Sequence, residues 1–413
     1  IENLSSDGSG VAHSPDGETV FIPGAAPGDE ARVRIVKDCK RYAFGILDEV
    51  LTPSPDRIPV DCAVAGPCGG CSLRHLDYAA ELRAKQENVA DAFARIGGLD
   101  VPVLPIVGSP EVNRYRNKVQ FPVGVDKSGK PCIGFYAGRT HRIVPCPDCR
   151  LQPGVLNEIG NALCAFFAEK GIQPYSEETG RGLVRHIFLR RGAHSGQIMV
   201  CLVCTRAKLP SAEELCTRLK AQFAEITTIL LNVNAKNTNV ILGTETHTLY
   251  GQGYIEDTLC GVPVQLGPLS FYQVNTLAAE QLYGIAAQYA QLTPDDLLLD
   301  LYCGMGTIGL SMAAHCRELI GVEIVPEAIE SAKANAARMG ADVAAKSRFF
   351  CADAGQAATR LAAEGLHPDI VMLDPPRKGC DEATLSAVVR MSPRRVVYVS
   401  CNPATAARDA AWL

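Results

Sequence analysis

Cys401 is the residue whose type and position most directly suggest covalent chemistry in this 413-residue sequence. It follows the apolar run Val396–Val399 and precedes Pro403, which predicts a buried strand that ends where a helix begins. Reacting groups gather at the carboxyl ends of strands in an open α/β sheet. A thiol beside the N–H groups of a helix start can ionise more readily and act as a nucleophile. The alternative is a buried cysteine that packs as a small hydrophobic residue.

A second group of residues predicts a cofactor site. Gly304, Gly306 and Gly309 follow the apolar strand pattern 297–301 and satisfy G-x-G-x-x-G, and Glu323 lies about 20 residues further on, so a nicotinamide enzyme is one interpretation. However, Asp300 directly precedes the glycine loop, where a carboxylate can hold the amino acid part of S-adenosylmethionine. Two further strands end in Asp353 and in Asp374-Pro375-Pro376. We therefore predict a methyltransferase rather than a nicotinamide oxidoreductase.

The residues after Asp374 indicate which atom is methylated. An aromatic residue after Asp-Pro-Pro is typical of enzymes that methylate exocyclic nitrogens of bases, but here Arg377 follows. Cys401 offers a different route, because addition of a thiolate to C6 of uracil gives an enolate whose C5 can attack a methyl group. The sequence thus favours methylation at C5 of a pyrimidine.

A cysteine cluster predicts a metal centre. Cys62, Cys68 and Cys71 form C-x5-C-x2-C among several glycines, and Cys146 and Cys149 offer two choices for a fourth ligand. Four thiolates suit either zinc or an iron–sulfur cluster. By contrast, Cys201 and Cys204 lie in an alternating apolar strand, where we expect them to be core residues.

Composition limits the class of protein. The chain has 17 cysteines and no signal-peptide pattern, which favours reduced thiols and a cytoplasmic location. No apolar run approaches the roughly 20 residues needed to span a bilayer. The net charge of −5 does not itself indicate nucleic-acid binding, so contacts with RNA must come from local basic clusters such as Arg114–Lys118 and Arg139–Arg142. Residue 1 is Ile rather than Met, so we expect that the natural start lies upstream.

The expected fold is multidomain α/β. Residues 1–52 carry short alternating runs between Gly-rich turns, which predicts an OB-like antiparallel barrel of about five strands. Residues 53–265 contain the cysteine cluster, a predicted helix over 77–97 and an antiparallel α+β domain with helices near 153–170 and 211–223. Residues 266–413 predict a C-terminal doubly wound, Rossmann-like methyltransferase domain, with five parallel strands that end near Leu301, Glu323, Asp353, Asp374 and Val399.

Several stretches of the sequence resemble known protein families. The segment GSGVAHSPDGETVFIPGAAPGDEARVRI resembles the TRAM domain, an RNA-binding barrel. DLYCGMGTIG, GVE, LDPPRKG and SCNPAT resemble the RNA uridine C5-methyltransferase family over essentially the whole chain. Within that family, the barrel and the cysteine cluster are similar to the 23S ribosomal RNA branch, and DLYCGMGTIGLSMA resembles the enzymes of Gram-positive type.

The resemblance implies a role for each matching residue. It implies S-adenosyl-L-methionine as methyl donor and a [4Fe–4S] cluster. The implied partner is 23S ribosomal RNA, in which the target uridine flips out of a single-stranded loop, and the enzyme is expected to be a monomer. Transfer RNA is an alternative substrate, and a non-catalytic iron–sulfur RNA-binding protein is an alternative class. The family's general base is a glutamate near the C-terminus, which this sequence does not contain; we expect the sequence to be truncated there. The implied residues are Cys401 as nucleophile, Gln273, Tyr302, Thr307, Glu323, Asp353 and Asp374 as cofactor contacts, and Cys62, Cys68, Cys71 and Cys149 as cluster ligands.

Overall fold

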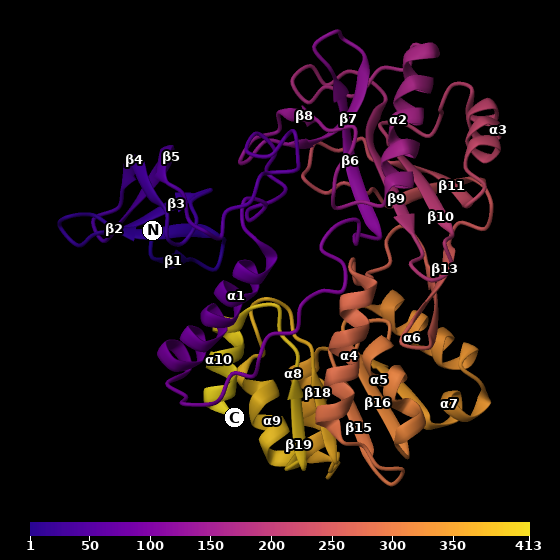
Figure 1. The fold of residues 1–413 in the computed structure, drawn as a ribbon. Helices are drawn as coiled ribbons and strands as arrows, with labels where there is room; N and C mark the ends of the chain where they lie inside the picture. Colours follow the sequence, from indigo (N-terminus) through magenta and orange to yellow (C-terminus); the bar gives the residue numbers. More distant parts are fainter.

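The structure is a computed structural model that describes residues 1–413, and its chain forms three main sheets (Figure 1). An N-terminal sheet lies to one side, a seven-stranded sheet forms the central part, and a five-stranded parallel sheet forms the C-terminal part. No helix combines the length and the apolar character needed to cross a membrane.

The N-terminal sheet has the order β1-β2-β3-β5-β4. Its strands are β1 (Asn3–Leu4), β2 (Ser9–His13), β3 (Thr19–Pro23), β4 (Glu30–Asp38) and β5 (Tyr42–Thr52). The prediction of a wholly antiparallel barrel is wrong in one respect, because β3 pairs with β5 in parallel. The long β4–β5 hairpin folds back so that β5, rather than β4, lies beside β3. The hydrophobic core of the N-terminal sheet is small and includes Val20, Ile22 and Ala43.

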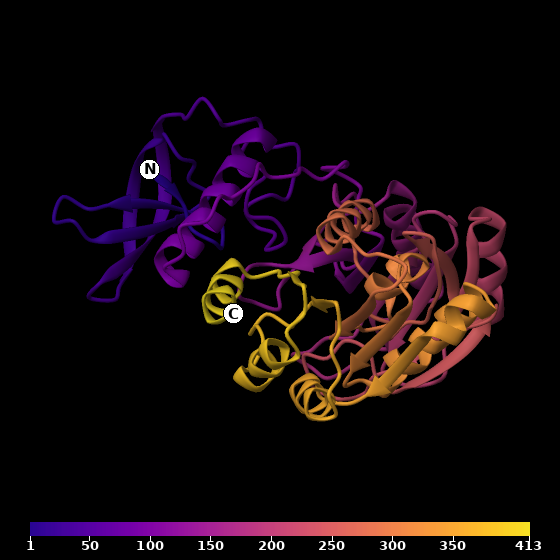
Figure 2. The same ribbon diagram turned by 90° about the horizontal axis from the view of Figure 1, so that it is seen from below.

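Residues 53–117 connect this sheet to the rest of the molecule. Arg57 holds the start of the segment against the N-terminal sheet through an ion pair with the buried carboxylate of Asp29, at 2.6 Å. Helix α1 (Tyr78–Ala92) continues into a π-helical turn over Phe93–Gly97, and Gly98 ends it in the left-handed conformation with φ 63°. Both views place α1 beside the C-terminal helix α10 (Pro403–Trp412) (Figures 1 and 2).

The central sheet has the order β12-β11-β10-β9-β6-β7-β8, and only the β10–β11 pair is parallel. Helices α2 (Gly154–Glu169) and α3 (Ala212–Gln222) confirm the helices predicted near 153–170 and 211–223, and both pack on one face of the sheet. The strands are β6 (Lys118–Val125), β7 (Pro131–Tyr136), β8 (Ile143–Pro145), β9 (Val184–Arg191), β10 (Ile198–Cys204), β11 (Ile226–Val233) and β12 (Glu245–Tyr250).

The other face of the central sheet packs toward the C-terminal domain. Phe188, Met199 and Cys201 from this face belong to one core cluster with the hairpin β13 (Ile255–Leu259) and β14 (Val262–Leu266) and with helix α4 (Thr276–Ala290). Cys201 and Cys204 are fully buried, which confirms that they are core residues. The core therefore continues from one sheet to the next through the hairpin.

The C-terminal sheet is parallel throughout, with the order β17-β16-β15-β18-β19. This confirms the five predicted strands, which are β15 (Leu297–Leu301), β16 (Glu318–Glu323), β17 (Ser347–Cys351), β18 (Ile370–Leu373) and β19 (Arg395–Tyr398). Helices α4, α5 (Thr307–Met312) and α6 (Pro326–Arg338) cover one face, and α8 (Ala354–Ala363) and α9 (Glu382–Met391) cover the other. A short helix, α7 (Ala341–Lys346), precedes β17.

Candidate active site

The predicted site residues lie along one edge of the C-terminal sheet. Asp353 follows β17, Glu323 ends β16, Tyr302 follows β15, Asp374 follows β18, and Cys401 follows β19. Because all five strands run in parallel, their carboxyl ends meet at this edge in the order of the sheet. The fold thus brings together residues that are up to 99 positions apart in the sequence, from Tyr302 to Cys401.

Asp300 is the carboxyl group at this edge whose pKa is raised most. Its carboxylate is fully buried, Oδ2 accepts the Gly309 N–H at 3.0 Å, and Oδ1 has no partner. Burial raises the pKa of Asp300 to about 8. Position 309 must be glycine, because a Cβ there would lie 2.8 Å from Asp300 Oδ2. An orphaned buried oxygen at the glycine loop is suited to accept hydrogen bonds from a cationic ammonium group.

Glu323 organises the neighbouring loop. One carboxylate oxygen accepts the N–H of Gly304 at 3.1 Å, and the other accepts the N–H groups of Ile324 and Val325 at 2.9 and 3.0 Å. Ile324 and Val325 follow it with largely exposed apolar side chains, 62% and 45% exposed. A fixed carboxylate beside exposed apolar surface suits the ribose and adenine of a nucleoside. Asp353 caps α8 by accepting the Gln356 N–H at 3.1 Å.

Tyr283 is a residue of this site that sequence analysis missed. Its hydroxyl lies 3.2 Å from that of Thr307, and both side chains are buried. Burial raises the pKa of Tyr283 to about 12, although hydrogen bonds with Thr307 and Gln273 act in the opposite direction. Tyr283 therefore remains a neutral phenol that links two predicted cofactor contacts. Its position in the middle of α4 gave no signal in the sequence.

Tyr302 has φ of 65°, a conformation that is unusual for a residue other than glycine. Its hydroxyl lies 3.4 Å from that of Thr384. Strain of this kind is found mainly where the surrounding structure fixes a functional side chain.

Asp374 and Cys401 occupy neighbouring strand ends. Burial raises the pKa of Asp374 to about 6. Cys401 is exposed, and the next residue, Asn402, caps α10 by accepting the Ala404 N–H at 3.1 Å. Asn402 also donates its amide to the carbonyl of Arg377 at 3.1 Å. This hydrogen bond ties the Asp-Pro-Pro-Arg loop to the helix start that carries the thiol.

A buried carboxylate, Asp409, fixes α10 behind Cys401 and was not predicted. Its Oδ2 accepts the Cys380 N–H at 2.7 Å and the Tyr398 hydroxyl at 2.5 Å. Arg408 pairs with the other oxygen and donates to the Cys380 carbonyl. Gly379, with φ of 78°, passes so close that a Cβ there would lie 2.5 Å from Asp409 Oδ2. The sequence shows only an acid late in a helix, because all of its partners other than Arg408 are distant in the chain.

Residues of the central domain hold the turn that carries Gln273. Asn117 is buried and donates to the Gln273 carbonyl at 2.7 Å and to the Thr276 hydroxyl at 2.9 Å. Arg190 is 1% exposed and donates to the carbonyls of Gly267 and Ser270. Burial lowers the pKa of Arg190 to about 10. The central sheet therefore determines where Gln273 lies.

The predicted cluster cysteines lie in one region of the structure. Burial is the main cause that raises the pKa values of Cys68 and Cys71, and the charges of Cys62 and Cys149 contribute in the same direction. A hydrogen bond from Cys146 lowers the pKa of Cys149 to about 6. All five thiols are free, but no group of three or more His, Cys, Asp or Glu side chains is arranged to hold a metal ion. Cysteine thiolates are suitable ligands for a metal centre, but these side chains are not arranged around one point as the ligands of a bound ion would be.

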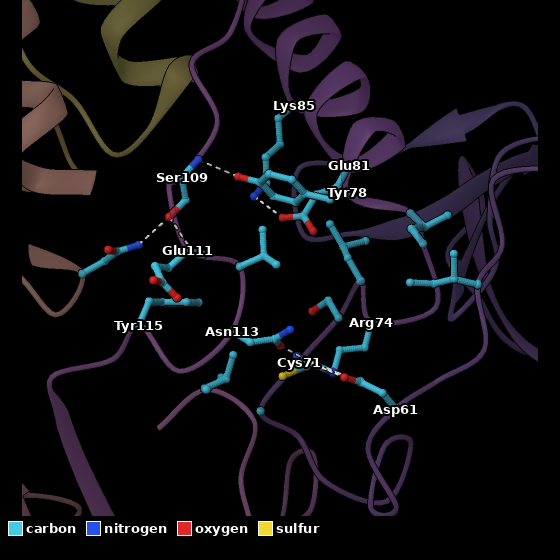
Figure 3. Close-up of a pocket in the computed structure, with 18 residues that line it drawn as sticks. Asp61, Cys71, Arg74, Tyr78, Glu81, Lys85, Ser109, Glu111, Asn113 and Tyr115 are labelled. Atoms are coloured by element: carbon cyan, nitrogen blue, oxygen red, sulfur yellow. Dashed lines mark hydrogen bonds and ion pairs between the residues drawn. The ribbon is translucent and has the colours of Figure 1, made fainter. Parts of the chain in front are cut away.

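A cavity of about 490 Å³ adjoins this region, and Cys71 is one of the residues that line it (Figure 3). It extends from the cysteine-rich segment to Asn275, the residue that caps α4. A second cavity, of about 320 Å³, lies beside it and is lined by Arg191, Asn117 and the first turn of α4.

Comparison with known proteins agrees with these observations. A structure of Pyrococcus abyssi tRNA (uracil-54, C5)-methyltransferase, in complex with S-adenosyl-L-homocysteine, is 27% identical, covers 100% of this chain and 92% of its own, and has a TM-score of 0.79. A protein of Halalkalibacterium halodurans named as an uncharacterized RNA methyltransferase is 43% identical over 99% of this chain and 88% of its own length. One of Staphylococcus epidermidis with the same name is 40% identical over 99% and 89%. The TRAM domain matches residues 1–47, and the family described as tRNA (Uracil-5-)-methyltransferase matches residues 192–413. The chain therefore belongs to the RNA uracil-5-methyltransferase family and carries an N-terminal TRAM domain.

Proposed function

We propose that this protein methylates C5 of a uridine in 23S ribosomal RNA through a covalent adduct between Cys401 Sγ and C6 of the base. One observation carries the proposal: an exposed thiol lies at a strand end next to Asp374, on the sheet edge that also carries Asp300 and Glu323. S-adenosylmethionine supplies an electrophilic methyl group on a sulfonium. Asp300 would bind its ammonium group, and Glu323 its ribose. Gln273, Tyr302, Thr307, Asp353 and Asp374 complete the proposed contacts.

The chemistry of Cys401 follows from the electronic structure of uracil. The thiolate adds to C6 and pushes the electron pair toward O4, and the resulting enolate carbon C5 takes the methyl group. A base then removes the C5 proton, and the electron pair of that C–H bond expels the thiolate and restores the double bond. Cys401 begins and ends the cycle as a thiolate, so no oxidant or reductant is needed.

Three cations at the start of the central sheet support an RNA substrate. Arg116, Lys118 and Arg191 form no ion pair. Arg191 lines the cavity of about 320 Å³, and the backbone of Arg116 pairs with that of Asn275, the residue that caps α4. Burial, together with the nearby charges of Arg190 and Arg116, lowers the pKa of Lys118. Unpaired cations beside the active site attract phosphate groups. We further propose that Cys62, Cys68, Cys71 and Cys149 hold a [4Fe–4S] cluster with a structural role, and that the enzyme acts as a monomer in the cytoplasm.

Transfer RNA is a second candidate substrate, because the Pyrococcus abyssi enzyme named for uridine 54 of tRNA matches this chain along its entire length. The test uses radiolabelled S-adenosylmethionine with transcripts of 23S ribosomal RNA and of tRNA in parallel. We expect incorporation into 23S ribosomal RNA and an adduct with 5-fluorouridine-containing RNA that withstands denaturing electrophoresis. Incorporation into tRNA alone selects the second candidate, and incorporation into neither refutes both.

A further inference from the structure

The cavity of about 490 Å³ lies between the cysteine-rich segment, the first turns of α1 and the segment that leads into β6 (Figure 3). Asn275 closes one end and donates its amide to the Ser109 hydroxyl at 3.0 Å. Asn275 is two residues from Gln273, so the cavity adjoins the candidate active site. It contains none of the seven proposed cofactor contacts.

The charges in the cavity are unfavourable for a phosphate. Lys85 pairs with Glu81 at 2.5 Å, and Arg74 forms a two-pronged ion pair with Asp61 at 2.8 Å. Both cations are therefore neutralised. Glu111 forms no ion pair, so its carboxylate is the charge that remains. A ligand that donates hydrogen bonds is favoured over an anion.

Other groups in the cavity have unused hydrogen-bonding capacity. Asn113 accepts from Arg74 at 2.7 Å through its carbonyl oxygen, which leaves its amide N–H groups free. The Tyr78 hydroxyl accepts the Ser109 N–H at 2.7 Å and retains its own proton to donate. Tyr115 makes no side-chain hydrogen bond and adds a second aromatic ring to the wall. Aromatic rings with amide and carboxylate groups are what proteins use to bind single-stranded bases.

We infer that this cavity binds one unpaired nucleobase that flanks the target uridine in the RNA substrate, and that it selects a base with an exocyclic amino group. The Glu111 carboxylate accepts from that amino group, and the Asn113 amide donates to the neighbouring ring nitrogen or carbonyl. Adenine, cytosine and guanine each carry such a donor beside an acceptor, whereas uracil has no amino group. The inference rests on the proposed function, because it assumes an RNA substrate.

The experiment measures binding of fluorescent heptaribonucleotides that have a central uridine and flanks of only A, C, G or U. Wild-type protein is expected to bind at least one amino-bearing heptamer about ten-fold more tightly than the all-uridine heptamer, a typical discrimination for one paired set of hydrogen bonds. Glu111→Gln and Asn113→Ala are expected to reduce this ratio to about one while affinity for all-uridine RNA is retained. Glu178→Gln and Asn237→Ala, at exposed positions outside the cavity, serve as matched controls and should keep the ratio.

Three results would overturn the inference: equal affinity for all four heptamers, no binding of any heptamer, or an unchanged ratio in both cavity variants. Methyl transfer by the wild-type protein, measured on the same preparation, separates this inference from the proposed function. If the wild-type protein incorporates methyl groups but the affinity ratio is unchanged in both cavity variants, only the inferred base subsite is refuted. Absence of incorporation removes the proposed function itself.

Discussion

Replacing Asp300 with asparagine is expected to stabilise the fold at neutral pH and to abolish cofactor binding. Burial raises the pKa of Asp300 from 3.8 to about 8. Between these values the native protein keeps a proton that the unfolded chain releases, so folding stability falls as pH rises and levels off above the folded pKa. At pH 7 this retained proton costs roughly 4 kcal/mol, from about 1.4 kcal/mol for each pH unit above 3.8. Asparagine does not titrate and avoids this cost.

The quantity to measure is how the free energy of unfolding changes with pH, because asparagine also introduces a pH-independent difference in hydrogen bonding at the position of the unpartnered Oδ1. Urea unfolding at pH 5, 6 and 7 can follow the fluorescence of Trp412, the single tryptophan, which lies in α10 of the C-terminal domain. The stability of Asp300→Asn relative to wild type is expected to rise by about 1.4 kcal/mol per pH unit over this range. Parallel curves for the two proteins would refute the assigned burial cost.

Cofactor affinity gives an independent check on the same carboxylate. If the ionised form binds the ammonium group, the affinity of wild-type protein for S-adenosylmethionine should increase up to about ten-fold per pH unit from pH 6 to 8 and then level off. Calorimetry at pH 6, 7 and 8 measures this. Affinity that does not change with pH, or tight binding by Asp300→Asn, would show that Asp300 does not contact the cofactor.

Three further predictions follow from other contacts. Cys401→Ala should lose the denaturation-resistant adduct with 5-fluorouridine RNA and keep RNA affinity within about two-fold, since one small side chain contributes little to binding that depends mainly on phosphate contacts. Filter binding and gel electrophoresis test this, and a surviving adduct would exclude Cys401 as nucleophile. Asp409→Ala leaves the Tyr398 hydroxyl without its acceptor and should destabilise the α10 region by about 3 kcal/mol. The adduct should form more slowly, whereas the affinity for S-adenosylmethionine should not change. A normal rate of adduct formation would show that Asp409 does not position the thiol. Burial alone would raise the pKa of Asp29, but hydrogen bonds from Arg57 and from backbone N–H groups lower it. The stabilisation that the Asp29 carboxylate contributes is therefore present above pH 3.8 and is lost on acidification. Asp29→Asn should cost about 3 kcal/mol and release the N-terminal sheet in limited proteolysis at pH 7, and an unchanged digestion pattern would contradict this.

Much of the C-terminal domain could be predicted from the sequence because its signals are local. The inner strands β15, β16 and β18 are largely buried on both faces, so their sequences are mostly apolar, as in Leu297–Leu301. The glycines that follow β15 and the acid that ends β16 lie within a few residues of the strands that position them. Each candidate residue could therefore be assigned to a strand end without knowledge of its neighbours.

The N-terminal sheet illustrates where local signals end. Short alternating runs and Gly-rich turns predict about five strands here, but the order of the strands in the sheet depends on which edges meet. β4 forms the edge of the sheet and β5 returns antiparallel to it, between β3 and β4, which makes β5 parallel to β3. The β4–β5 register includes three irregularities. An alternating pattern specifies a strand and its buried face, not its partner.

The sequence by itself determined the strand-end chemistry of this protein: the thiol of Cys401, the glycine loop and the carboxylates. Those features need only residue type and period, which the linear pattern contains. The tertiary structure alone decided the partners of Asp409 and Arg190, the orphaned oxygen of Asp300 and the walls of the cavity at Glu111. The hydrogen bonds from Arg190 cross 77 and 80 positions of sequence. Contacts between residues so far apart in the sequence depend on how the packed layers meet. Burial sets the pKa values at the site, and it exists only once those layers have formed.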